Sequence, residues 1–127
     1  MRGVDWRAVL RDNVRAEDGA LGVAGVRVAV TCAGRATQVV VTRDDGRAIA
    51  DDEVLTVATN DYLAGGSLAR DLAAPLTDEA IAAAPTLRDA VGAALAAVGP
   101  LRGDDARWYD AAHPRVALPH ARPVRCR

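Results

Sequence analysis

Valines alternate with other residues in one short segment, and this pattern restricts the fold more than any other. Val26, Val28 and Val30 are separated by Arg27 and Ala29. An alternation of period two places the valines on one face of a half-buried strand. Residues 33–34 break the pattern, and the β-branched run at 38–42 predicts a second strand. The two segments predict a β-hairpin, which needs a further layer to be stable in water.

Two helices, each with one apolar face, are also expected. The first follows Asp5, which we expect to act as its N-cap, and its apolar face carries Trp6, Val9, Leu10 and Val14. Thr86 is predicted to cap the second, with Asp89 in the capping-box position. Gly99 and Pro100 should end this helix, and its expected buried stripe consists of Leu87, Val91, Leu95 and Val98.

The remaining elements are shorter. Residues 54–59 are mostly apolar and predict a third, central strand. An Ala-rich helical turn is expected between Thr77 and Pro85. In the tail, prolines at 114, 119 and 123 exclude a helix, and residues 115–118 predict an edge strand. The predicted class is therefore α+β, a small mixed sheet with two to three helices.

Size and charge limit the other possibilities. At 127 residues, half of them hydrophobic, the chain is expected to form a single domain over residues 1–127. We divide it into a lead-in at 1–22, a core at 23–100 and an irregular tail at 101–127. With 16 basic and 17 acidic residues, nothing favours nucleic acid or an anionic membrane as partner. No apolar run approaches the roughly 20 residues of a membrane span, and the N-terminal residues form no secretion signal.

The chain has two cysteines, Cys32 and Cys126, which most of the sequence separates. Neither belongs to a C-x-x-C pair, which argues against zinc. In a reducing compartment they would remain separate thiols. In an oxidising compartment a bridge would fix the tail to the first strand and contribute on the order of 4 kcal/mol. We predict the bridge.

The loop at 56–68 carries the residue types expected of a ligand site. Asn60 and Asp61 are turn formers whose side chains can bond to backbone or ligand. Tyr62 is one of only two tyrosines, and Gly65 and Gly66 allow a ligand to approach the backbone closely. An aromatic face beside bare backbone is suited to a flat heterocycle.

At these residues the sequence resembles the C-terminal domain of the 5′-nucleotidase family. That family has an apolar strand, then Asn, an optional residue, an aromatic, a small spacer and Gly-Gly-Asp-Gly. Here the corresponding residues are Val57-Ala58-Thr59-Asn60-Asp61-Tyr62-Leu63-Ala64-Gly65-Gly66. The resemblance runs from about residue 6 into the C-terminal region, with supporting segments at 25–28, 44–49 and 86–90.

The resemblance implies a substrate-binding portion of a larger enzyme. Tyr62 would stack on the base, with Asn60, Asp61, Gly65, Gly66 and Ser67 around the nucleoside. A second aromatic would lie upstream, outside this chain. Catalysis would belong to a missing N-terminal metallophosphoesterase domain with two divalent metal ions, in a periplasmic or secreted parent. No cofactor or catalytic residue is expected in this chain itself.

One departure from the family pattern leaves alternatives open. Ser67 and Leu68 stand where the family has Asp-Gly, and its Asp helps to position the sugar. The chain could therefore be a degenerate, stand-alone module for binding or self-assembly, and a truncated domain with an open strand edge favours homo-oligomers. An independent enzyme ranks last, because no nucleophile–base set is visible. His113 and His120 are isolated and do not predict a metal site.

Overall fold

The computed structural model describes residues 1–17, 19–60, 62–63, 83, 86–105, 108 and 110–127. The chain divides into two units. The first combines Met1–Thr56 with Ala112–Arg127, and the second is Val57–Ala111. Because the first unit takes in both ends of the chain, the tail is part of a core and not an appendage to it.

The predicted hairpin forms the centre of the first unit. Strands β1 (Val26–Ala33) and β2 (Ala36–Arg43) pair antiparallel along their full lengths. Gly34, with φ of 56°, makes the turn between them in the left-handed region that glycine adopts at little cost. Val28 faces Val41 across the pair, and both are buried. The alternation in the sequence therefore identifies the buried face of β1.

A third strand makes the sheet mixed. β3 (Val116–Ala117) lies parallel to β1 and gives the order β2-β1-β3. The Val28 amide donates to the Arg115 carbonyl at 2.8 Å beside it. The predicted edge strand in the tail and the α+β class are both confirmed.

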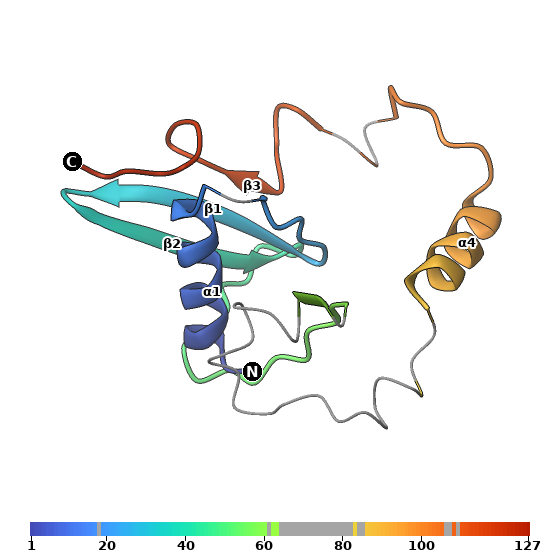
Figure 1. Ribbon diagram of the computed structural model, residues 1–127, viewed down its shortest axis with the longest axis horizontal. Helices are drawn as coiled ribbons and strands as arrows, with labels where there is room; N and C mark the ends of the chain where they lie inside the picture. The colour runs from blue at the N-terminus through green and yellow to red at the C-terminus, as the bar shows by residue number, and fades with distance from the viewer. Residues whose placement is uncertain (18, 61, 64–82, 84–85, 106–107, 109) are drawn as a thin grey trace. The chain divides into compact units, whose positions relative to one another are not determined.

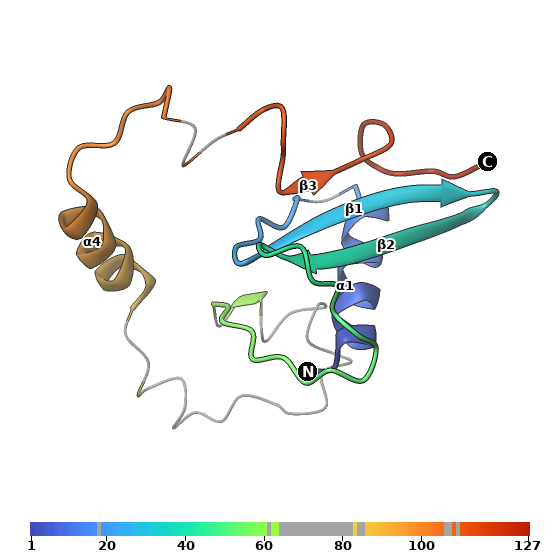
Figure 2. The same ribbon diagram turned by 180° about the vertical axis from the view of Figure 1, so that it is seen from behind.

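Helix α1 (Gly3–Arg15) packs against the hairpin, as both views show (Figures 1 and 2). Leu10 and Val14, which belong to this helix, are buried. The predicted cap is wrong: Arg2 is the N-cap, and Asp5 lies three positions into the helix. From there its carboxylate accepts the Arg2 amide at 3.3 Å, as acidic side chains in a first turn do. The helix begins earlier than predicted.

The core of this unit draws residues from all of its segments. The tail contributes Val124, which has 0 % exposure and whose amide donates to the Val14 carbonyl at 2.9 Å. The Arg122 guanidinium donates to the Asn13 carbonyl at 2.5 Å, near the end of α1, where a cation is favourable. The buried hydrophobic residues are Leu10, Val14, Val28, Val30, Val41, Ile49 and Val124.

The central strand predicted at residues 54–59 does not form. Val54 makes a single bridge to Arg2 and is 79 % exposed. The amide of Leu55 donates to the Met1 carbonyl at 2.8 Å. Residues 54–55 pair with Met1 and Arg2. Because α1 begins at Gly3, no further extended residues are available to continue this pairing.

In the second unit, α4 (Leu87–Val98) begins and ends as predicted. The Asp89 amide donates to the Thr86 hydroxyl at 3.2 Å, and Gly99 has a φ of 80°. The expected burial of its stripe is wrong, because exposure ranges from 43 % at Leu95 to 66 % at Leu87. The Ala-rich turn predicted at 77–85 lies outside the described residues, apart from residue 83. No helix in the described part of the chain is long and apolar enough to cross a membrane.

Candidate functional site

Only part of the loop at 56–68 falls within the described residues. Asn60, Tyr62 and Leu63 are described, whereas the predicted site residues Asp61, Gly65, Gly66 and Ser67 lie outside them. The described residues 57–60 and 62–63 belong to the second unit. The geometry of the candidate site is therefore that of Asn60 and the short turn after it.

The Asn60 side chain organises this turn. Its Oδ1 atom accepts the Leu63 amide at 2.8 Å, the local bond by which asparagine starts a turn. Tyr62 and Leu63 have helical geometry directly after it. In this structure Asn60 acts as a clamp on the backbone.

Tyr62 follows the clamp and is 84 % exposed. Large aromatic side chains contribute most to binding when their faces become buried. Leu63, in contrast, is half-buried. On this turn, the Tyr62 side chain is therefore exposed to solvent, whereas that of Leu63 is half-buried.

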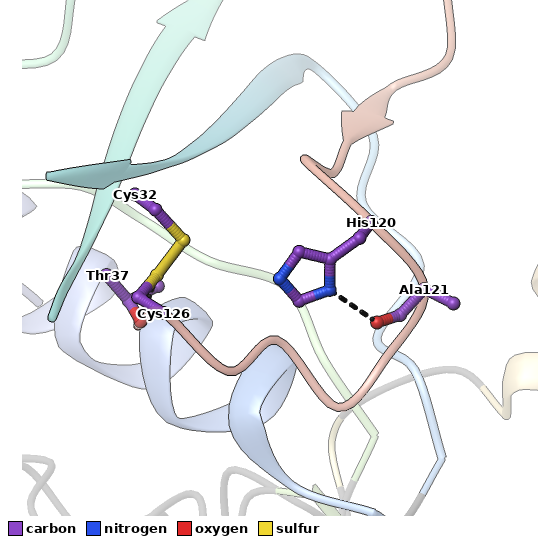
Figure 3. The surroundings of a disulfide bond; sticks show 5 residues. All are labelled: Cys32, Thr37, His120, Ala121 and Cys126. Atoms are coloured by element: carbon purple, nitrogen blue, oxygen red, sulfur yellow. Dashed lines mark hydrogen bonds between the residues drawn. A yellow bond between two sulfur atoms is a disulfide. The ribbon is translucent and has the colours of Figure 1, made fainter. Parts of the chain in front are cut away.

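The disulfide between Cys32 and Cys126 is present, as predicted (Figure 3). The two Cα atoms are 5.4 Å apart, within the usual range for a bridge. The bridge joins β1 to the tail, and Thr37 Oγ1 lies 3.4 Å from the Cys126 sulfur. A hollow of about 500 Å³ adjoins it. The sequence analysis did not identify Thr37, which carries no signal beyond its place in a strand pattern.

His120 lies beside the bridge. Its Nδ1 donates to the Ala121 carbonyl oxygen at 3.0 Å (Figure 3). Among the described residues there is no group of three or more His, Cys, Asp or Glu side chains that could hold a metal ion.

A cluster of charged residues surrounds Glu53, and the sequence analysis did not identify it. The guanidinium groups of Arg43 and Arg47 donate to its carboxylate, Arg47 at 3.3 Å, and hold the pKa of Glu53 well below its usual range, at about 2. The Ala50 amide also donates to it at 3.3 Å. These bonds close the turn after β2, so the cluster is a structural one.

Comparison of the chain with protein families, curated proteins and solved structures finds no match.

Proposed function

We propose that this chain is the substrate-binding portion of a 5′-nucleotidase-like metallophosphoesterase, with Tyr62 as one face of a nucleoside pocket. The observation that carries the proposal is the 84 % exposure of Tyr62 on a turn clamped by Asn60. Stacking of a base on an aromatic ring contributes about 1–3 kcal/mol, and every base offers a face.

Phosphate-ester hydrolysis would then belong to the parent. The two divalent metal ions implied by the resemblance would be held in the N-terminal metallophosphoesterase domain, outside this chain. The disulfide supports a periplasmic or secreted parent, because bridges persist in oxidising compartments. The purified chain should leave AMP intact when divalent metal is supplied. Steady hydrolysis of AMP would contradict the assignment of catalysis to the parent's N-terminal domain.

Nucleoside titration followed by two-dimensional NMR tests the binding role. Adenosine should shift the amide signals around Tyr62, with weak affinity because the chain supplies one aromatic wall. Tyr62→Phe keeps the ring face and should keep the affinity. Tyr62→Leu should weaken it about 5- to 150-fold, which corresponds to the stacking energy. Equal binding by the leucine variant, or no shifts at any nucleoside concentration, would contradict the proposal.

The exposed stripe of α4 favours a second candidate, a self-assembly module without catalytic activity. Leu87, Val91, Leu95 and Val98 are each more than 40 % exposed. Apolar helix faces of this kind associate in pairs. Sedimentation should then show dimers that Leu95→Glu abolishes, whereas Ala93→Glu, about opposite on the helix, should leave them intact. A monomer at all concentrations would eliminate this candidate and leave the nucleoside test unaffected.

A further inference from the structure

The hollow beside the disulfide lies in the first unit, so it is independent of the Tyr62 turn. Its volume of about 500 Å³ lies within the range of sites for small organic molecules. Both sulfur-bearing residues contribute to its wall. The lining consists of Cys32, His120, Pro123, Arg125, Cys126 and Arg127.

The two sulfur atoms of the bridge have different surroundings. Cys32 is exposed, whereas Cys126 is half-buried and packs against the core. A disulfide sulfur carries no hydrogen, so the Thr37 hydroxyl must be the donor in its 3.4 Å contact with the Cys126 sulfur. Such a bond strengthens when its acceptor gains negative charge. Thr37 is therefore placed to stabilise a thiolate at Cys126.

Two cationic side chains line the same hollow. Arg125 and Arg127 are exposed at its wall. Arg125 lies 3.6 Å from Glu17, but both side chains are more than half exposed, and exposed pairs hold their partners weakly. The His120 ring nitrogen that does not bond to Ala121 faces the bridge (Figure 3). The two guanidinium groups of Arg125 and Arg127 therefore favour an anionic ligand in the hollow.

We propose that this hollow binds small thiols that carry carboxylate groups, and that such a thiol opens the Cys32–Cys126 bridge by exchange. The bound thiolate attacks the sulfur of Cys32, the more exposed of the two residues, which forms a mixed disulfide and releases Cys126 as a thiolate beside Thr37. A second thiolate attacks the mixed disulfide, giving the oxidised thiol dimer and the Cys32 thiolate. Two electrons pass from two thiols to the bridge, and the protons released by those thiols reprotonate the cysteines.

The first unit has other contacts that hold its tail while the exchange takes place. Val124 is fully buried, and its amide bonds to Val14. Arg122 bonds to the end of α1, and the Val28 amide bonds to the Arg115 carbonyl next to β3. None of these contacts passes through the sulfur atoms. Attack on Cys32 therefore requires no unfolding of the unit.

Reduction kinetics of the full chain, measured by alkylation and mass spectrometry, test the proposal. The two probes are reduced glutathione, which is anionic, and 2-mercaptoethanol, which is neutral. Arg125→Ala/Arg127→Ala should slow reduction by glutathione about 3- to 10-fold and by 2-mercaptoethanol less than twofold. Arg88→Ala/Arg102→Ala, with the same charge change in the second unit, should alter neither rate. Equal effects on both thiols, or no effect on either, would overturn the anionic site.

A second pair of variants tests the direction of attack. Thr37→Val removes the hydroxyl and should slow reduction by both thiols, whereas Thr37→Ser keeps the donor and should keep the rate. Quenched samples should carry the glutathione adduct on Cys32. An adduct on Cys126, an unchanged rate in the valine variant, or reduction that proceeds only as urea unfolds the unit would overturn the exchange step. Circular dichroism of each variant before reduction confirms that it is folded.

Discussion

Glu53 shows how a single carboxylate can organise a turn. It is 19 % exposed and accepts from Arg43, Arg47 and the Ala50 amide. The sequence places two acids ahead of it at 51–52, and composition alone does not distinguish Glu53 from those acids. What distinguishes it is the return of the chain after β2, which brings both arginines to one carboxylate. An arrangement that depends on the path of one turn leaves no periodic signal in the sequence.

The pKa of Glu53, lowered from 4.5 to about 2, predicts an acid-dependent loss of stability. Because folding lowers this pKa, the contribution is fully present above about pH 4.5 and is lost as the pH falls towards 2. Melting temperatures should show Glu53→Gln below the wild type at pH 7, and the two should converge near pH 2. Glu17→Gln, at an exposed pair, is the control and should follow the wild type throughout. A constant difference at every pH would contradict the assignment.

At the scale of elements, sequence patterns identify the hairpin, the tail strand and α4, and they fail at residues 54–59, where too little partner strand is available. Strands β1 and β2 follow from alternation and a glycine turn, and α4 follows from its Thr86 cap. The segment at 54–59 has strand composition, but its available partner is two residues long. For the candidate site, the sequence located Asn60 and Tyr62 on a turn; it could not supply the Asn60–Leu63 bond or the surroundings of the disulfide.

The start of α1 depends on a close approach that only glycine permits. A Cβ at Gly3 would fall well inside contact distance of the Ala50 carbonyl oxygen and 2.9 Å from Ile49 Cγ2. Because backbone cannot give way easily, Gly3→Ala should lower the free energy of unfolding by about 1–3 kcal/mol. Gly92 in α4 has no atom within 4 Å of such a Cβ, so Gly92→Ala should instead stabilise its helix by about 0.5–1 kcal/mol.

Urea denaturation followed by far-ultraviolet circular dichroism measures the first effect. Amide hydrogen exchange along α4 measures the second, since the helix belongs to the other unit. If Gly3→Ala left the free energy of unfolding unchanged or raised it, the packing assigned to Gly3 would be wrong.

At the scale of the whole molecule, the division into two units separates stability from the candidate nucleoside site. The hydrophobic core cluster and the disulfide lie in Met1–Thr56 and Ala112–Arg127, whereas the Tyr62 turn and α4 lie in Val57–Ala111. The tail, which we expected to be irregular, is bonded to β1 and α1. Residues 57–111 therefore form an insertion between the two chain segments of the first unit.

Replacement of residues 57–111 by a flexible Gly/Ser linker tests this separation. A linker of about 20 residues spans roughly 25 Å on average and closes a shorter loop than the native segment, at slightly lower entropic cost. The shortened chain should retain the Cys32–Cys126 bridge, the NMR signals of β1 and β2, and a single cooperative thermal transition. Because the described core lies in the retained segments, its melting temperature should stay within a few degrees of the parent's. Loss of the cooperative transition, or loss of the dispersed NMR signals of β1 and β2, would mean that the second unit contributes packing essential to the first.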